Sequence, residues 1–135
     1  MSALRARAQA LLEDDPYVQS QGIELICIDE TSSVLEMMIT ADQRSFLQAA
    51  HGGCLFSLAD TAFGLTANCA GTVSVGIDTH MAYIRGCKVG DRCWAVGVSL
   101  KSFPENLIFC NHKGAPGHGV RGPQHKFKPD FASKV

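Results

Sequence analysis

The chain has 135 residues, enough for one domain with a substantial hydrophobic core. Its formal net charge of -1 and isoelectric point near 6.5 give no sign of the basic surface that nucleic-acid or anionic-membrane binding requires. The N-terminal stretch carries acids and no apolar signal-peptide core, and no apolar run approaches the ~20 residues of a membrane span. We therefore expect a cytoplasmic protein with no nucleic-acid and no membrane partner.

The first predicted element is a short amphipathic helix over residues 3–13, which ends at Asp14-Asp15-Pro16. We expect it to pack at the edge of the domain. From Gly22 the hydrophobic period changes to two, which predicts a hairpin of strands over 23–28 and 34–40. Both faces of the second strand are partly apolar, so we expect a helix against one face and a neighbouring subunit against the other.

A connection over residues 41–50 leads to the stretch HGGCLFSLADTAFGLTANCAG, His51 to Gly71, which predicts a long buried helix. Its apolar residues recur at helical spacing. They are Leu55, Leu58, Ala59, Ala62, Phe63 and Ala67. Asp60 is the one formally charged residue between Arg44 and Asp78, so a carboxylate stands in the most apolar part of the chain. Such a placement calls for a chemical role.

The open amides at the start of this helix and the carboxylate of Asp60 lie far apart along its axis. Gly52 and Gly53 leave the first helical amides open, where they can bind an anion or a polarised carbonyl oxygen. Asp60 follows about 10 Å further along the axis, at ~1.5 Å per residue. Because one helix cannot easily bring both groups to one atom, we predict a dimer in which a second copy supplies one of them. Asp60 must then not point into open solvent.

Beyond the helix, residues 72–84 predict a long strand with a bend at Gly76, and residues 92–102 predict another. Strands joined by hairpins indicate an α+β fold with an antiparallel sheet. Arg85 and Lys88 are either ordinary turn charges or contacts for a substrate phosphate, and His80 is interpreted as a structural histidine within its strand. His51 either caps the helix or orients a substrate.

The chain changes character near its end. We predict a domain over residues 1–110, with at most a short final strand over 107–110, and an irregular tail over 111–135 that is rich in Gly, Pro, His and Lys. Cysteine and histidine residues there invite a metal site, but their spacing matches no compact zinc motif, so we expect no metal. They are Cys110, His112, His118 and His125.

The six cysteines of the chain show no CxxC pair and lie mostly in apolar segments. Without an export signal, we interpret them as buried hydrophobes that stay reduced. Cys54 is the exception to test, because the N-terminus of a helix lowers a thiol pKa and favours a nucleophile. No base stands near Cys54 in the sequence to activate it.

The residues HGGCLFSLADTAFGLTAN, with the following DTHMAYIRG and VGDRCWA, resemble the hotdog-fold thioesterases of the phenylacetyl-CoA (PaaI) type. The resemblance covers about residues 5–100 and is strongest over 51–69. It implies an antiparallel sheet wrapped around a central helix, homodimers with shared active sites, and often homotetramers. It also implies hydrolysis of an acyl-CoA in phenylacetate degradation, with phenylacetyl or hydroxyphenylacetyl as the acyl group. Coenzyme A is then part of the substrate, and no separate cofactor is needed.

The resemblance assigns roles to individual residues. Asp60 activates water or attacks the thioester directly, and the amide of Gly53 in the opposite subunit polarises the carbonyl, with His51 and Gly52 shaping the turn. Ser57, Thr61 or helix amides of the partner subunit would have to keep Asp60 charged.

The sequence also departs from that family in places. Ser45 and Gln48 stand where the family often has Asn and Gly, although Gln48 can take over a carbonyl contact, and Gly86 replaces a usual proline. Residues 103–135 lack the family's two long closing strands, and a shifted reading frame is one hypothesis for that end.

Two alternative functions stay open. A hotdog enoyl-CoA hydratase would use an acid and a histidine together, but His51 and Asp60 are nine residues apart. A non-catalytic or impaired acyl-CoA-binding protein, with its sheet compromised by the tail, is the other.

Overall fold

The computed structural model describes residues 2–69, 71, 73–99 and 104–111, the last of these by backbone alone. The last strand runs over Pro104–Asn111, so the expectation of at most a short strand over 107–110 is wrong, and the first residue of the predicted irregular tail belongs to this strand. Residues 112–135, with the three histidines of the tail, lie outside the described residues, and so does the side chain of Cys110. The domain boundary at residue 110 stays a prediction. The elements in chain order are α1 (Ala3–Glu13), α2 (Pro16–Gln21), β1 (Ile23–Ile28), β2 (Ser32–Met38), the 3₁₀ helix η1 (Ala41–Gln43), α3 (Gly52–Asn68), β3 (Arg92–Ser99) and β4 (Pro104–Asn111).

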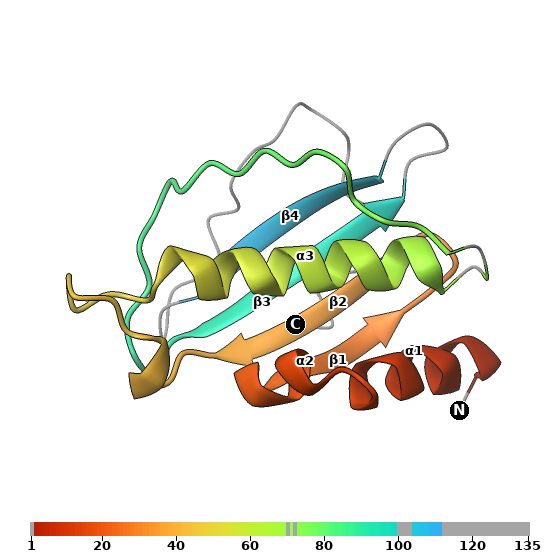
Figure 1. Ribbon diagram of the computed structural model, residues 1–135, viewed down its shortest axis with the longest axis horizontal. Coiled ribbons are helices and arrows are strands. Elements are labelled where there is room, and N and C mark those ends of the chain that lie inside the picture. The colour runs from red at the N-terminus through yellow and green to blue at the C-terminus, as the bar shows by residue number, and fades with distance from the viewer. Residues whose placement is uncertain (1, 70, 72, 100–103, 112–135) are drawn as a thin grey trace.

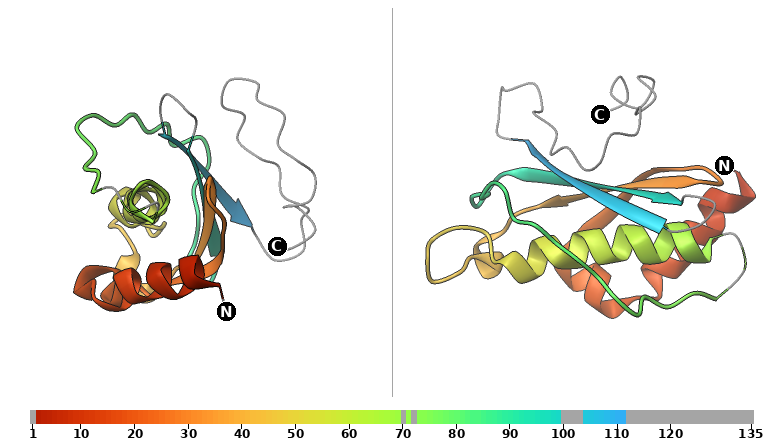
Figure 2. Two further views of the ribbon diagram at one scale, coloured as in Figure 1. Left: turned by 90° about the vertical axis from the view of Figure 1, so that its right-hand side faces the viewer. Right: turned by 90° about the horizontal axis from the view of Figure 1, so that it is seen from above.

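The four strands form one antiparallel sheet in the order β1-β2-β3-β4. Helix α3 lies across one face of this sheet, and α1 with α2 runs along the edge formed by β1 (Figures 1 and 2). The register pairs Val34 with Val96, and Glu36 with Trp94, whose indole N–H donates to the Glu36 carboxylate at 2.7 Å. This arrangement confirms the predicted α+β class and the antiparallel sheet on a central helix.

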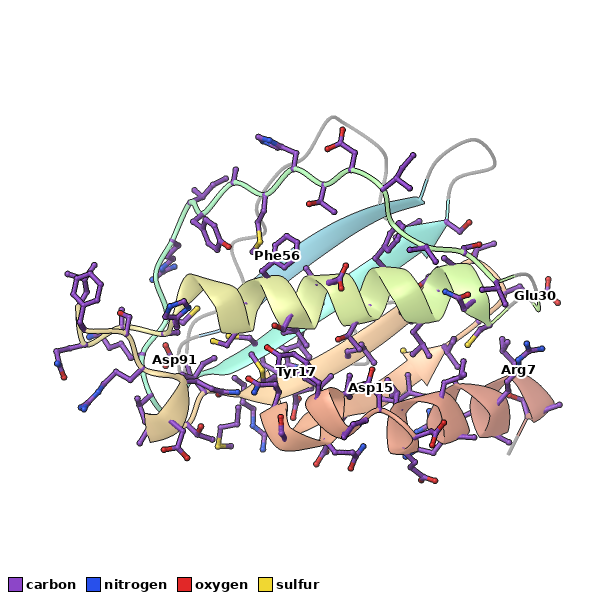
Figure 3. The ribbon with its side chains drawn as sticks, in the orientation of Figure 1. Arg7, Asp15, Tyr17, Glu30, Phe56 and Asp91 are labelled. Atoms are coloured by element: carbon purple, nitrogen blue, oxygen red, sulfur yellow. The ribbon has the colours of Figure 1, made fainter. Side chains whose placement is uncertain are left out.

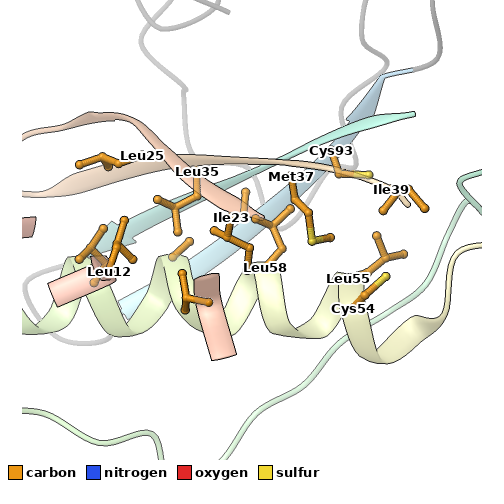
Figure 4. Packing of buried hydrophobic residues seen from close by; sticks show 14 of the residues in the cluster. Leu12, Ile23, Leu25, Leu35, Met37, Ile39, Cys54, Leu55, Leu58 and Cys93 are labelled. Atoms are coloured by element: carbon orange, nitrogen blue, oxygen red, sulfur yellow. The ribbon is translucent and has the colours of Figure 1, made fainter. Parts of the chain in front are cut away.

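The core lies between α3 and the sheet (Figure 4). Leu58 and Ala62 of α3 are fully buried against Leu35 and Met37 of β2 and Ala95 of β3. Each large apolar side chain that is removed from water contributes about 1.5–3 kcal/mol to folding. The helical spacing read from the sequence therefore identifies the buried face of α3 in part. Leu55, Leu58 and Ala62 are buried as predicted, whereas Ala59, Phe63 and Ala67 are only partly buried. The helix also buries Cys54, Leu65 and Thr66, which the prediction did not include.

Gly97 on β3 lets the sheet approach α3 closely. A Cβ atom at this position would lie 2.5 Å from the carbonyl oxygen of Ala62 and would also collide with the hydroxyl of Thr66. That hydroxyl donates to the same carbonyl at 2.8 Å and lies 2.7 Å from the hydroxyl of Ser33, which is fully buried on β2. The buried polar groups at this contact are thus hydrogen-bonded, and the backbone of β3 sits directly on the helix.

Helix α2 is an element that the sequence analysis did not predict. Its N-cap is Asp15, whose carboxylate accepts from the amides of Tyr17 and Val18 at 3.0 and 3.1 Å, and Pro16 stands in the first turn. An aspartate followed by proline is a common way to begin a helix. The signal was therefore present, but it was interpreted only as the end of α1.

The strand predicted over residues 72–84 is wrong for the described part, residues 73–84, which form no strand and pass over α3 as an extended segment (Figures 1 and 2). Val73, Val75 and Ile77 are 88%, 80% and 99% exposed. A strand needs the backbone of a neighbour, and none of the four sheet strands pairs with this segment. His80 is consequently exposed and outside any strand.

Candidate functional site

Asp60 lies in the middle of α3, on the face turned away from the sheet, and its side chain is exposed. It lines an open cavity of about 360 Å³ between α3 and the helices α1 and α2, whose Asp15 and Tyr17 are labelled in Figure 3. The other lining residues are Leu11, Leu12, Val18, Phe56, Ser57, Thr61, Gly64, Leu65 and Asn68. The requirement that Asp60 be shielded from solvent is therefore not met by the single chain.

The neighbours of Asp60 on α3 use their hydroxyl groups elsewhere. Ser57 donates to the carbonyl of Gly53 at 2.7 Å, and Thr61 donates to the carbonyl of Ser57 at 2.7 Å. Among the residues that the structure describes, none donates a hydrogen bond to the Asp60 carboxylate. In this chain Ser57 and Thr61 thus make no hydrogen bond to Asp60, and its carboxylate is exposed to solvent. The carboxylate is free to act on a bound molecule.

The N-terminus of α3 offers one open amide, and it belongs to Gly52. The imidazole of His51 caps the helix, because its Nδ1 accepts from the amide of Gly53 at 2.9 Å, while the amide of Cys54 donates to the carbonyl of His51 at 3.0 Å. Within the described part of the chain, the Gly52 amide has no acceptor. The donor available to a carbonyl therefore lies one residue earlier than Gly53, the residue that the sequence analysis selected.

A second cavity, of about 250 Å³, opens beside this amide. The hydroxyl of Tyr83 donates to the carbonyl of Gly52 at 3.1 Å, so the extended segment is tied to the start of α3. The cavity is lined by Ala50, Gly52, Leu55, Tyr83, Ile84, Arg85 and Gly86. Arg85 is exposed at its edge, where a phosphate could reach it. Tyr83 lines this cavity, and the sequence analysis missed it. The one available signal was its position two residues before Arg85, a candidate substrate contact.

Asp60 and the Gly52 amide do not meet within one chain. They are eight residues apart on α3, about 12 Å along the axis at ~1.5 Å per residue. The two cavities beside them share no lining residue. Within the single chain, Asp60 and the Gly52 amide thus lie at two separate cavities.

Gln48 is not brought to either cavity. It lies exposed in a tight loop in which its amide donates to the carbonyl of Ser45 at 3.0 Å, and its φ is +64°. Glycine adopts this left-handed conformation without strain, whereas other residues rarely do. The position therefore suits a glycine for conformational reasons.

The thiol groups are structural where they are described. Cys54, Cys69, Cys87 and Cys93 are buried, Cys27 is partly buried, and none of these five forms a disulfide. Burial raises the pKa of the Cys54 thiol, whose sulfur lies 3.0 Å from the carbonyl of His51. The helix N-terminus thus does not produce a thiolate here, which argues against a nucleophilic Cys54.

The part of the chain that the structure describes has neither a metal site nor a membrane-spanning helix. No group of three His, Cys, Asp or Glu side chains in this part is placed to hold a metal ion. No helix in it is long and apolar enough to cross a bilayer.

Comparisons with known proteins agree with this geometry. The sequence profile of the Thioesterase superfamily matches residues 47–101, which include α3, the extended segment and β3. The acyl-coenzyme A thioesterase PaaI of Escherichia coli is 38% identical over 84 residues, which are 62% of this chain and 60% of that relative. The structure of the E. coli PaaI protein superposes with a TM-score of 0.74 at 28% identity, covering 88% of this chain and 94% of the other.

The chain is thus similar in sequence to the thioesterase superfamily over residues 47–101 and similar in fold to the E. coli PaaI protein. Its fold is the hotdog fold of the PaaI structures. A hypothetical thioesterase protein of Streptococcus pneumoniae, solved with coenzyme A, shares this fold at 18% identity and a TM-score of 0.61, over 70% of this chain and 77% of that one. The sequence match spans about three fifths of the length of the E. coli relative.

Proposed function

We propose that the protein is an acyl-CoA thioesterase, which hydrolyses the thioester to a free acid and coenzyme A. The observation that carries the proposal is the carboxylate of Asp60, which stands uncommitted beside a cavity on a helix whose first amide is also open. These are the two groups that thioester hydrolysis needs, a base or nucleophile and a donor for the developing oxyanion. The similarity to the E. coli thioesterase supports the same chemistry.

In the proposed mechanism Asp60 takes a proton from water as the water oxygen attacks the carbonyl carbon. Direct attack by the carboxylate, followed by hydrolysis of the anhydride, would give the same products. The Gly52 amide donates to the carbonyl oxygen as it becomes negative, and the positive end of the α3 dipole adds to that stabilisation. The carbon–sulfur bond then breaks, and the coenzyme A thiolate takes up the proton.

We propose that each complete site forms between two copies of the chain, with Asp60 from one and Gly52 from the other. The 12 Å or so between these groups in one chain, at ~1.5 Å per residue, supports this division. The exposed apolar side chains of Val73, Val75 and Ile77 provide surface for such a contact. A homodimer is the smallest assembly that completes both half-sites, and association of dimers into a homotetramer is the larger form that we propose.

For the substrate we propose an aryl-acetyl thioester, phenylacetyl-CoA or a hydroxyphenylacetyl-CoA. The cavity beside Asp60 has the volume expected for an aromatic acyl group, and part of its lining is apolar, from Leu11, Leu12, Val18, Phe56 and Leu65. Arg85, exposed beside Gly52, is placed to contact a phosphate of coenzyme A. The reduced cysteines agree with a cytoplasmic location.

Replacing the carboxylate tests the proposal. Asp60→Asn should lower kcat for phenylacetyl-CoA by about 10²- to 10⁴-fold, the usual contribution of a general base, as measured by release of free thiol. Asp42→Asn, which neutralises an exposed aspartate on η1, should leave kcat unchanged. Retention of more than a tenth of the wild-type kcat by Asp60→Asn would remove Asp60 from the mechanism.

The non-catalytic alternative has its own signature. A protein that only binds acyl-CoA would bind a non-hydrolysable thioether analogue of phenylacetyl-CoA but release no thiol from the thioester itself. A hydratase would instead consume the conjugated double bond of crotonyl-CoA, which is followed by absorbance.

A further inference from the structure

Tyr17 of α2 reaches across the cavity beside Asp60 to the central helix. Its phenol oxygen lies 2.8 Å from the hydroxyl oxygen of Ser57 on α3, and both residues line the cavity that Asp60 lines. Figure 3 labels Tyr17 beside α3. This contact joins α2 to α3 one helical turn before Asp60. The mechanism proposed above gives Tyr17 no role.

The direction of the hydrogen bond between these two hydroxyl groups follows from counting protons. Ser57 has one hydroxyl proton, and it donates this proton to the carbonyl of Gly53 at 2.7 Å. Tyr17 must therefore donate its own proton to Ser57. The phenol oxygen then keeps its lone pairs, so within the cavity it is an acceptor and not a donor.

Several other polar groups of the cavity are already hydrogen-bonded to the backbone. Asp15 accepts from two helix amides, Thr61 donates to a helix carbonyl, and Asn68 bonds the backbone of Ser74. Of the apolar residues in the wall, Leu12, Val18 and Leu65 are buried, at 4%, 2% and 5% exposure, whereas Leu11 is 44% exposed. The cavity thus presents an acceptor at Tyr17, which is 55% exposed, beside these apolar side chains and the carboxylate of Asp60.

These two groups are spaced for one acyl group. Ser57 and Asp60 are three residues apart on α3, so their Cβ atoms lie about 5–6 Å from each other. An aryl-acetyl group with its carbonyl carbon near Asp60 would extend its ring along the apolar wall, toward Ser57 and the phenol of Tyr17. A hydroxyl group on that ring would there meet an acceptor held in place by Ser57.

We infer that Tyr17 determines substrate specificity by accepting a hydrogen bond from a hydroxyl group on the acyl part of the thioester. The inference rests on the proposed thioesterase function and adds to it a residue that selects hydroxylated over unsubstituted aryl-acetyl groups. A site that is built to hydrogen-bond a hydroxyl discriminates against the analogue that lacks it.

Tyr17→Phe tests the inference, because it removes the acceptor and keeps the ring. The measurement is kcat/KM for 4-hydroxyphenylacetyl-CoA, 3-hydroxyphenylacetyl-CoA and phenylacetyl-CoA. For at least one hydroxylated substrate, its ratio to phenylacetyl-CoA should fall about three- to tenfold, the usual worth of one neutral hydrogen bond. The phenylacetyl-CoA value itself should stay within about twofold of wild type, since no hydrogen bond is lost with that substrate.

Ser57→Ala is the second variant. It keeps the phenol but removes its anchor, so the same ratio should fall by a smaller factor. An equal loss with all three substrates would make Tyr17 merely structural, and unchanged ratios for both hydroxylated substrates would overturn the inference. Circular dichroism of each variant checks that α2 and α3 are intact.

Failure of the thioesterase proposal would be distinguishable from failure of this inference. If the wild-type protein hydrolyses none of the three thioesters, the hydrolase function fails. The role of Tyr17 is then decided by calorimetric Kd values for thioether analogues with and without the ring hydroxyl. Tyr17→Phe should abolish the preference for a hydroxylated analogue, and the absence of such a preference in the wild type would contradict the inference.

Discussion

The two faces of α3 differ in burial and in hydrogen bonding. The face against the sheet is closed: Leu58 and Ala62 are fully buried, and the hydroxyl of Thr66 is hydrogen-bonded at the contact with Gly97. The opposite face is open, with the carboxylate of Asp60 exposed and no described residue donating to it. One face is packed into the core, and the other presents an exposed carboxylate at an open cavity. The sheet side thus stabilises the fold, and the open side is left for a ligand or for a second chain.

The largest effect on stability is expected on the closed face. Gly97→Ala should lower the free energy of unfolding by about 3 kcal/mol, because the added methyl group would collide with backbone of α3, which cannot move without shifting the helix. Thermal or denaturant unfolding measures this change.

Gly64→Ala on the open side of α3 is the matched control, since a Cβ there meets no atom within 4 Å. It should raise stability by about 0.5–1 kcal/mol through the helix propensity of alanine. If both variants had the same stability, the distinction between the two faces would be wrong.

A smaller effect on stability is expected in the loop that precedes α3. Gln48→Gly should raise the free energy of unfolding by up to about 1 kcal/mol, because it relieves a non-glycine residue at φ +64°. The gain is limited by the greater freedom of glycine in the unfolded chain. Gln48→Ala, which keeps the strain, should show no such gain.

The smallest effect on stability is expected at Asp29, an exposed residue in the turn between β1 and β2. Burial would by itself raise the pKa of Asp29, but hydrogen bonds from the amides and hydroxyls of Thr31 and Ser32 outweigh it and lower the pKa below 3.8. The ionised form therefore stabilises the folded state above pH 3.8, and this contribution is lost as the pH falls through the lowered pKa.

The size of the Asp29 effect should be under about 1 kcal/mol, because the group is exposed. The measurement is the difference in unfolding free energy between wild type and Asp29→Asn, which should be constant near neutral pH and shrink on acidification. A difference that grows as the pH falls would contradict the sign.

The sequence predicts the closed side of the molecule well and the open side poorly. The buried face of α3 and the β1–β2 hairpin follow from periodicity, because the partners of those residues lie in the same chain. The segment 73–84 has the alternation of a strand, yet a period of two reveals an apolar side and not which backbone pairs with it. For His51 the sequence leaves two roles open, a helix cap or a substrate contact, and the structure shows the cap: its imidazole accepts from the Gly53 amide and leaves the Gly52 amide open.

The shared site can be tested with two inactive variants that are refolded together. Asp60→Asn removes the carboxylate. Gly52→Pro removes the open amide at the first position of α3, where proline is well tolerated and where His51 already has the extended backbone that precedes proline. Gly52→Ala, which adds a Cβ near the Tyr83 ring but keeps the amide, is the control for crowding.

If each site takes Asp60 from one subunit and Gly52 from the other, half of the randomly mixed dimers carry one intact site. The mixture should then recover about a quarter of the wild-type thiol release, although each variant alone is inactive. A mixture no more active than its two components would contradict the division of the site between subunits.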